Sequence, residues 1–358
     1  MKENHFPKKE NTTKNYLQSK EIPLVSIIIL NYNHEKLLEK AIDSALQQIY
    51  PRKEIIVVDD GSTDNSHHII AGYGGKIKTV FQENKGSASG WNAGLFASEG
   101  EIIFFLDADD VFLPHKIEKM VNFFLQVLPN HSDVMIFHRL EMVTLDGIKL
   151  GFKPKRVRNL QGKQKKGQLE MISQPDEVYR YLQKWGFLPF RSAPTSGLAL
   201  TRSLADKFFP LPSVRRFPDS FLLFGAMVLG FVYGTPCVLG RYVLHGKNVT
   251  LTQITILKDV IEVRDAFLND LLQRNNKEPI VSFLDSRFAR RPYELFGTIT
   301  DLLRLVYQVP ARFLCWETLR FSFRTLFACL RATLGFQKQH LRKQRVFEKA
   351  TKEREKTL

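Results

Sequence analysis

Short apolar runs alternate with amphipathic segments along the first third of the chain. The runs at 24–30, 54–58 and 102–106 are each followed at once by polar residues. Continuous apolar runs of this length are typical of strands that are buried on both faces of a parallel sheet. After the first run, apolar residues recur at helical spacing behind Asn33, which is placed to cap the helix: Leu37, Leu38, Ala41, Ile42, Ala45 and Leu46. The pattern predicts successive strand–helix–strand units of the parallel-sheet type.

The same reading extends along the chain with decreasing detail. A strand at 77–81, a loop with Gly86 and a helix around 92–97 complete a third unit, in which Gly86 and Gly94 are expected to permit tight turns. An amphipathic helix beyond Pro114 and a strand at 134–140 follow. The basic, glycine-interrupted stretch 153–166 is predicted to be a mobile loop, and 188–248 to return to short strands and turns.

Three regions follow from this periodicity. Residues 1–22 lack it and are predicted to form a disordered arm, whereas 23–250 form one α/β domain. Residues 251–358 are predicted to be a helical and increasingly basic carboxyl-terminal extension. The length is sufficient for one large domain with such an appendage.

Polar residues gather where the predicted strands end. Residues 31–33 follow the first strand, Asp59 and Asp60 the second, and 107–110 the strand at 102–106. Because the carboxyl ends of parallel strands share one rim, these clusters are expected to meet. Three carboxylates within four residues repel one another, and a divalent cation shared with a phosphate group is a common way to hold them ionised. The alternative is a solvated acidic turn that caps the next helix.

Charge and cysteine usage narrow the class of protein. The formal charge of +15 indicates contact with an anionic partner, such as nucleic acid, a phosphate-bearing substrate or an acidic membrane surface. Three scattered cysteines argue against a disulfide framework or a structural zinc site, and favour a reducing compartment. Neither a signal peptide at the start nor an apolar run of spanning length is evident, so we expect a soluble or membrane-surface protein.

Several motifs together resemble one enzyme family. The segments VSIIILNYN, DSALQQ, EIIVVDDGSTD, NKGSASGWNAGL and EGEIIFFLDADD occur in the order and spacing of a family 2 glycosyltransferase. The resemblance covers roughly 23–250. It implies the GT-A fold, a Rossmann-like and mostly parallel α/β sheet flanked by helices, to which the helical extension is added. It also implies transfer of a sugar from a nucleotide-diphosphate donor, most commonly a UDP-sugar, to a hydroxyl acceptor.

The resemblance implies a donor site in the first half of the chain. In this family a first loop lines the nucleoside site, and the matching residues here are Asn31, Tyr32, Asn33 and Glu35. Asp60 is expected to accept a hydrogen bond from the uracil or its ribose, and Lys85 to contact the nucleotide or its diphosphate. Stacking on an aromatic ring and a carboxylate that accepts from an N–H edge agree with this reading. The alternatives are a packed loop aromatic for Tyr32, a helix cap for Asp60 and a solvated side chain for Lys85.

The resemblance also implies a metal site. Asp107 and Asp109 form the DXD pair, in which Asp109 binds a divalent ion and Asp107 contacts the ribose or that ion. His245, in YVLHGKN, matches a histidine that approaches the metal or the diphosphate, although a lone histidine is more often structural. Carboxylates completed by phosphate oxygens and water suit Mg²⁺ or Mn²⁺.

Two further segments complete the implied site. Gly197, in PTSGL, resembles the glycine loop that shapes the donor and acceptor pocket. The segment FPDSFL resembles the one that carries the catalytic base of inverting members, but Pro218 replaces the usual acidic neighbour, so only Asp219 can be assigned. The alternative for Asp219 is the N-cap of a following helix.

Aromatic and basic residues share helical spacing near the carboxyl terminus, within 312–331. A helix of this kind suits the interface of an anionic membrane, and equally suits packing on the catalytic domain with its arginines in solvent. We therefore expect a protein in the cytoplasm or at the inner face of the cell membrane. The implied partners are a nucleotide sugar and a glycan or lipid-linked glycan acceptor.

Two rival functions stay open. A sugar nucleotidyltransferase shares the nucleotide-binding sheet, but would carry a glycine-rich, arginine-bearing loop where this chain has 31–33. A nucleic-acid-binding protein would explain the net charge, but the excess of basic residues lies in the stretch from Lys153 and in the tail, outside the ordered motifs. No nucleic acid partner is expected.

Overall fold

A computed structural model describes residues 22–279, with gaps at 150–167, 186–193, 214–217 and 246–256. The strands are β1 (Val25–Asn31), β2 (Lys53–Asp60), β3 (Lys78–Gln82), β4 (Ile102–Asp107), β5 (Asp110–Phe112), β6 (Val134–Thr144), β7 (Glu170–Ser173), β8 (Leu198–Thr201) and β9 (Phe231–Leu244). The helices are α2 (Glu35–Leu46), α3 (Ser66–Gly72), α4 (Ser87–Phe96), α5 (Lys116–Val127), α6 (Pro175–Trp185), α7 (Arg202–Phe208), α8 (Pro218–Leu229) and α9 (Leu257–Arg274), with short 3₁₀ turns η1 (Gly74–Lys76) and η2 (Thr195–Gly197). The predicted arm, basic loop and membrane helix lie outside the described residues.

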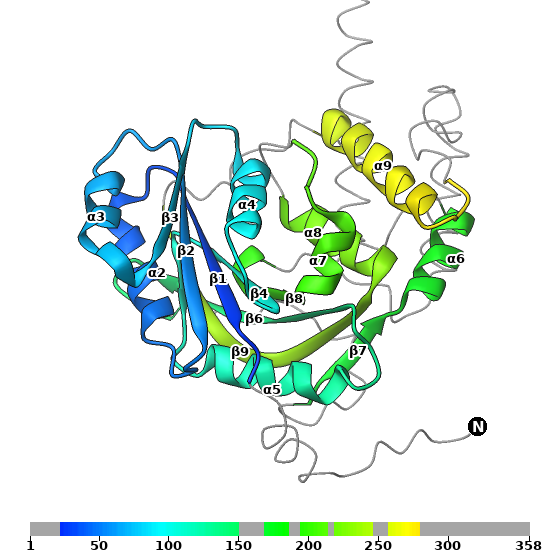
Figure 1. The fold of residues 1–358 in the computed structure, drawn as a ribbon, viewed down its shortest axis with the longest axis horizontal. Coiled ribbons are helices and arrows are strands. Elements are labelled where there is room, and N and C mark those ends of the chain that lie inside the picture. The colour runs from blue at the N-terminus through cyan, green and yellow to red at the C-terminus, as the bar shows by residue number, and fades with distance from the viewer. Residues whose placement is uncertain (1–21, 150–167, 186–193, 214–217, 246–256, 280–358) are drawn as a thin grey trace, which may run out of the picture. The chain divides into compact units, whose positions relative to one another are not determined.

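One mixed sheet organises the described residues. Its strand order is β3-β2-β1-β4-β8-β6-β9-β5, and β7 pairs with β9. The first four strands are parallel, as the sequence predicts. β8 runs antiparallel to both β4 and β6, whereas β6 and β9 are parallel to each other. Figure 1 shows the sheet across the middle of the molecule, with α5 below it and α4, α7 and α8 above.

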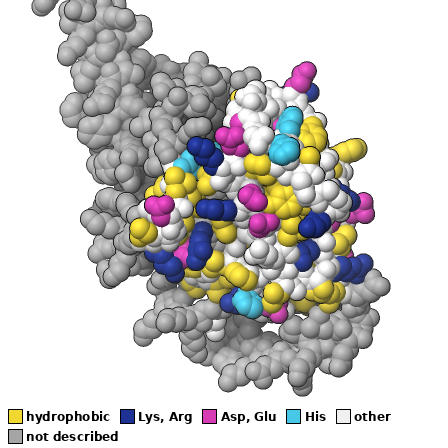
Figure 2. Space-filling model, turned by 90° about the vertical axis from the view of Figure 1, so that its left-hand side faces the viewer, with side chains coloured by type: hydrophobic (Ala, Val, Ile, Leu, Met, Phe, Trp, Pro, Cys, Tyr) yellow, Lys and Arg dark blue, Asp and Glu magenta, His cyan; other side chains and the backbone are white. Residues whose placement is uncertain are grey.

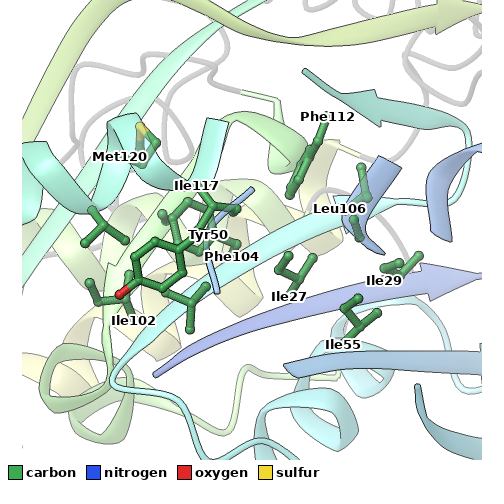
Figure 3. Close-up of a cluster of buried hydrophobic side chains, with 14 of the residues drawn as sticks. Ile27, Ile29, Tyr50, Ile55, Ile102, Phe104, Leu106, Phe112, Ile117 and Met120 are labelled. Atoms are coloured by element: carbon green, nitrogen blue, oxygen red, sulfur yellow. The ribbon is translucent and has the colours of Figure 1, made fainter. Parts of the chain in front are cut away.

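The core on one face comes from alternate residues of the parallel strands. Ile27 and Ile29 of β1, Ile55 of β2, and Phe104 and Leu106 of β4 are buried against α2 and α5 (Figure 3). Side chains alternate across a strand, so every second residue of each apolar run points to this face. Burial of each such side chain stabilises the folded state by roughly 1.5–3 kcal/mol. Strands that are buried on both faces therefore consist of continuous apolar residues, which is the pattern seen in the sequence.

The opposite face is covered by α4. Its Trp91 is fully buried and meets Phe105 of β4 edge to face, with ring centroids 5.1 Å apart. The sequence predicts a tight turn at Gly94, and this prediction is wrong. Gly94 lies inside α4, where an added Cβ would come within 2.3 Å of Ile28 of β1. Gly86 does act at a turn, with φ of 88° at the start of α4. The two glycines therefore serve backbone geometry and close packing respectively.

The second half of the chain differs from its sequence prediction. Besides the short turn η2 and the four-residue strand β8, which fit the prediction, 188–248 contains helices α7 and α8 and the 14-residue strand β9. α8 is apolar around most of its circumference because it is buried between the sheet and α9, which packs Phe267 on Phe221 with ring centroids 5.5 Å apart. Such a helix lacks the one-sided apolar stripe on which sequence reading depends. Among the described helices, none is long and apolar enough to traverse a bilayer.

Candidate functional site

Three strand ends meet at one rim of the sheet. β2, β1 and β4 are neighbours, and the register places Asn31 beside Asp59 and Leu30 beside Asp107. The polar residues after each strand therefore lie next to one another, as the sequence predicts. Two groups result, which we call the polar cluster (Asn31, Asn33, Asp59 and Asp60) and the acidic cluster (Asp107, Asp109 and Asp110).

Hydrogen bonds link Asn31 and Asp59 of the polar cluster. The Asn31 amide donates to Asp59 Oδ2 at 2.7 Å and to the Ser62 hydroxyl at 3.1 Å. Asp59 is fully buried, and its Oδ1 also accepts from the Ser62 backbone N–H and lies 3.1 Å from Nε2 of His67. Several N–H donors therefore surround the buried Asp59 carboxylate. Asn31 and Asp59 therefore join the ends of β1 and β2 rigidly.

The loop after β1 and the loop after β2 brace each other. Asn33, with φ of 56°, accepts through Oδ1 from the Thr63 backbone N–H at 2.8 Å. Asp64 accepts from the Glu35 N–H, while Glu35 Oε2 accepts from the Asn65 N–H at 3.0 Å. The N-cap of α2 is His34 and not Asn33, so the predicted cap is wrong. Asp64 thus accepts a hydrogen bond at the start of α2, and Glu35 accepts one at the start of α3.

Asp60 holds the loop between β3 and α4. Its side chain is almost fully buried and accepts from the backbone N–H groups of Lys85 and Gly86, both at 2.9 Å, and from the Gln82 amide at 2.6 Å. The Lys85 side chain itself is exposed. Tyr32 is 45% exposed at the tip of the first loop. The rim thus presents an accessible aromatic ring and an accessible ammonium around a buried, hydrogen-bonded carboxylate.

The acidic cluster has a different character. One carboxylate oxygen from each of Asp107, Asp109 and Asp110 lies within 4.8 Å of the others. Burial raises the pKa of Asp107 well above its ordinary value, and the charges of Asp109, Asp110 and Asp219 raise it further. Burial and the charge of Asp109 raise the pKa of Asp110 in the same direction. These groups are therefore close enough to oppose one another's ionisation.

His245 joins the acidic cluster from β9. Its Nε2 lies 2.8 Å from Oδ2 of Asp109, and both side chains are mostly buried. The ring of His34, from the start of α2, meets the His245 ring edge on, with centroids 5.5 Å apart. His34 thus connects the polar cluster to the acidic cluster, a role that sequence reading missed, although its position beside Asn33 offered a signal.

The turn η2 is hydrogen-bonded to Asp107 of the acidic cluster. Ser196 accepts through Oγ from the Asp107 backbone N–H at 3.0 Å, and the Thr195 hydroxyl bonds the Asp107 carboxylate. An added Cβ on Gly197 would come within 3.0 Å of the His138 carbonyl oxygen, so glycine permits this close approach. Gly197 was predicted to shape the site, but the sequence did not single out Thr195 or Ser196.

Asp219 lies in the first turn of α8. Its carboxylate accepts from the Ser220 backbone N–H, as an N-terminal helix residue does, and its charge acts on Asp107. Burial raises the pKa of Asp219 to about 6. The capping interaction and the proximity to Asp107 coexist, and the raised pKa gives Asp219 a proton affinity suited to acid–base chemistry near neutral pH.

The acidic cluster fits a hard divalent cation. Its donors are carboxylate oxygens that converge within a few ångströms, and burial raises the pKa of both Asp107 and Asp110. Oxygen-rich sets of this type suit Mg²⁺ or Mn²⁺, and an imidazole at the edge is compatible with Mn²⁺. The described residues thus place an acidic, cation-compatible site beside the polar cluster on one rim.

Comparisons with known proteins agree with this architecture. The family model described as glycosyl transferase family 2 matches residues 26–176. An uncharacterised glycosyltransferase of Nostoc sp. is 33% identical over 264 residues, which span 70% of this chain and 76% of the relative. An uncharacterised glycosyltransferase of Rickettsia prowazekii is 44% identical over 121 residues, 34% of this chain and 37% of that relative.

A solved structure supports the fold. The structure of S. aureus TarS 1-349 in complex with UDP-GlcNAc is similar with a TM-score of 0.50 and 18% identity, covering 81% of this chain and 82% of that one. The mostly parallel sheet flanked by helices is the GT-A architecture. With the matched family model and the extended similarity to the Nostoc protein, the chain belongs to glycosyl transferase family 2 and is a glycosyltransferase.

Proposed function

We propose that this glycosyltransferase moves a sugar from a UDP-sugar to a hydroxyl group of a glycan or lipid-linked glycan, with Mg²⁺ or Mn²⁺ and with inversion at the anomeric carbon. The observation that carries the proposal is the convergence of the acidic cluster, with its three carboxylate oxygens within 4.8 Å, beside the polar cluster on a single rim. One side of this rim suits a nucleoside, and the other suits the cation that accompanies its diphosphate.

The polar cluster supports a nucleotide donor. Tyr32 offers an exposed ring for stacking, and the exposed Lys85 offers positive charge for a phosphate. Asn31, Asn33, Glu35 and Asp60 hold the surrounding loops in place, and Asp60 keeps acceptor capacity beyond its three donors. The complex of TarS with UDP-GlcNAc, on a similar fold, favours uridine as the nucleoside of the donor.

The metal ligands we propose are Asp107, Asp109 and His245. Asp109 and His245 already face each other at 2.8 Å, and Asp107 is held by Thr195 and Ser196, with Gly197 leaving the room that this approach needs. When bound, the cation would neutralise charge that develops on the departing diphosphate. The carboxylates would hold the cation at this rim.

Asp219 is the base that we propose for the acceptor. A carboxylate with a pKa of about 6 is mostly ionised at neutral pH and still has appreciable proton affinity. It would take the proton of the acceptor hydroxyl as that oxygen attacks the anomeric carbon from the side opposite the diphosphate. The sugar–phosphate bond breaks as the new glycosidic bond forms, and the proton ends on Asp219.

The distribution of charged side chains on the surface bears on whether nucleic acid is a partner. Figure 2 shows the face that carries α3 and β3, on which basic, acidic and apolar side chains are interspersed rather than gathered into a basic stripe. This distribution differs from the basic stripe that is typical of a nucleic-acid-binding face. Action in the cytoplasm or at the inner face of the cell membrane, on a lipid-linked acceptor, completes the proposal.

A panel of nucleotide sugars tests the proposal. Purified protein is assayed for release of nucleoside diphosphate from UDP-, GDP-, ADP- and dTDP-sugars, with Mn²⁺, with Mg²⁺ and with EDTA. We expect UDP-sugars to be hydrolysed or transferred only with metal, and Asp109→Asn to abolish this activity. Asp146→Asn, which changes an exposed acid in the β6 turn, is the matched control and should behave as wild type. Metal-independent turnover, or a different preferred base, would refute the corresponding part of the proposal.

A further inference from the structure

An exposed histidine contacts the buried carboxylate of the polar cluster. His67 is the second residue of α3, and its side chain is 56% exposed, whereas the side chain of Asp59, near the end of β2, is fully buried. Nε2 of His67 lies 3.1 Å from Oδ1 of Asp59. Because a carboxylate accepts hydrogen bonds, Nε2 is the ring nitrogen that carries a proton in this contact.

The ring of Phe81 borders this contact on the neighbouring strand. Phe81 of β3 is paired with Asp59 of β2 in the parallel register, so the two side chains lie on the same face of the sheet. The His67 ring meets the Phe81 ring edge on, with centroids 4.7 Å apart. His67 is therefore held over the end of β2 by a carboxylate on that strand and by an aromatic ring on the next one.

The backbone of His67 is held by other contacts. The Asn65 N–H donates to Oε2 of Glu35, and the Ser66 N–H donates to Oδ1 of Asp64, both at 3.0 Å. These two bonds join the start of α3 to the loops after β1 and β2. The position of α3 is thus set without the imidazole, and a substitution of His67 changes its contact with Asp59 while the start of the helix keeps its own partners.

Asp59 connects this contact to the loop that carries Tyr32. Its Oδ2 accepts from the Asn31 amide at 2.7 Å, and its Oδ1 also accepts from the Ser62 backbone N–H at 2.8 Å. The Ser62 hydroxyl accepts in turn from the Asn33 backbone N–H at 2.9 Å. Asn31 and Asn33 are the two residues on either side of Tyr32. A continuous chain of hydrogen bonds therefore runs from the imidazole to both neighbours of the exposed ring.

The imidazole is the exposed end of this chain. The Asn31 amide is fully buried and the Ser62 donor belongs to the backbone, so neither can be replaced by water without a change in the loops. Loss of the imidazole would leave a buried acceptor short of a donor and free the Asp59 carboxylate to turn. Such a turn would move the acceptor of both remaining donors at once, because both bond to the same carboxylate.

We propose that His67 is a positioning residue for the donor site: its hydrogen bond to Asp59 holds the loops after β1 and β2, and with them Tyr32, in the arrangement that binds the nucleoside. His67 acts through Asp59 and not by contact with the donor. The inference rests on the proposed function for the identity of the ligand, but the hold of His67 on the two loops is testable without any ligand.

Hydrogen–deuterium exchange of the unliganded protein tests the hold on the loops. His67→Leu removes the donor and keeps water away from Asp59, whereas His67→Gln keeps a terminal N–H group that can reach it. Exchange is measured by mass spectrometry on peptides that cover 31–35 and 60–64. We expect exchange at least roughly threefold faster in His67→Leu and close to the wild-type rate in His67→Gln. His68→Leu, which changes the adjacent exposed histidine, is the matched control and should equal wild type.

Nucleotide binding and kinetics test the link to the donor. Calorimetric titration with UDP in the presence of Mn²⁺ gives Kd, and steady-state kinetics with the preferred UDP-sugar give KM and kcat. We expect Kd and KM to rise roughly 5- to 10-fold in His67→Leu while kcat changes less than about twofold, and His67→Gln to recover most of the affinity. A loss of folded protein would instead lower kcat and leave KM unchanged.

The outcomes decide between positioning and a purely structural contact. Wild-type exchange in His67→Leu would refute the hold on the loops. Faster exchange with an unchanged Kd, or no recovery in His67→Gln, would also overturn the proposal. Should His67→Leu fail to fold, His67→Ala gives the same comparison. A wild-type protein that binds no UDP would refute the uridine part of the proposed function. The titration would then use the nucleoside diphosphate that the donor panel identifies, and the exchange measurement would still test His67.

Discussion

The two halves of the rim hold their carboxylates in opposite ways. In the polar cluster, Asp59 and Asp60 accept hydrogen bonds from backbone and side-chain N–H groups. In the acidic cluster, Asp107 faces Asp109, Asp110 and Asp219, and its pKa is raised by burial and by those charges. The carboxylates of the polar cluster already have several donors, whereas a bound cation would reduce the repulsion among those of the acidic cluster. The difference is the basis on which we propose that the polar cluster shapes the site and the acidic cluster binds the cation.

The largest expected effect concerns Asp219. Replacing it by asparagine removes the proposed base and should lower the transfer rate roughly 100- to 10,000-fold, while the KM for the donor changes little. Steady-state kinetics with the preferred donor measure this. Asp176→Asn, which changes an exposed acid in the first turn of α6, is the control and should keep wild-type kinetics. A normal rate in Asp219→Asn would remove Asp219 from the mechanism.

The same substitution should stabilise the protein. The pKa of Asp219 is about 6 in the folded state against an ordinary 3.8, so the native state holds this proton more tightly than the unfolded state does. The free energy of unfolding therefore falls by up to roughly 3 kcal/mol as pH rises from below 4 to above 6, and the loss persists at neutral pH. Asp219→Asn should regain much of it. Urea unfolding at pH 5 and pH 7.5 measures both values, and unchanged or lower stability at pH 7.5 would contradict the assigned pKa.

Replacing Asp60 of the polar cluster by asparagine should lower the free energy of unfolding, whereas Asp219→Asn should raise it. Asp60→Asn replaces a carboxylate that accepts from the backbone of Lys85 and Gly86 and from Gln82. An amide offers one acceptor oxygen and turns an N–H group towards a donor, so we expect a loss of about 1–3 kcal/mol in the free energy of unfolding. Urea unfolding beside Asp219→Asn compares the two directly. Stabilisation in both variants would erase the contrast between the clusters.

The smallest expected effect concerns Glu35. Its Oε2 accepts from the Asn65 backbone N–H at the start of α3, so Glu35→Ala should lower the free energy of unfolding by about 1 kcal/mol. Donor kinetics distinguish bracing from contact. A KM that rises no more than about threefold fits a residue that holds the loop, whereas a large rise in KM with unchanged stability would assign Glu35 to direct contact with the donor.

The first half of the fold was predictable because its signals are local. The strands β1, β2 and β4 are continuous apolar runs, and the polar residues that end them reach one rim through parallel pairing alone. The sequence did not predict β9, and it indicated α8 only as the alternative in which Asp219 caps a helix. The burial of both elements is decided by contacts between distant segments, such as Phe221 with Phe267. The carboxylates of the site were found, but η2 supports them through tertiary contacts that spacing does not reveal.

Calorimetric titration of Mn²⁺ into the protein, with and without UDP, tests the central claim most directly: the acidic cluster is held for a divalent cation that a nucleotide diphosphate shares. We expect one saturable site, tighter binding when UDP is present, and loss of the signal in Asp109→Asn but not in Asp146→Asn. Binding that is equal in Asp109→Asn and wild type, or that is indifferent to UDP, would contradict it.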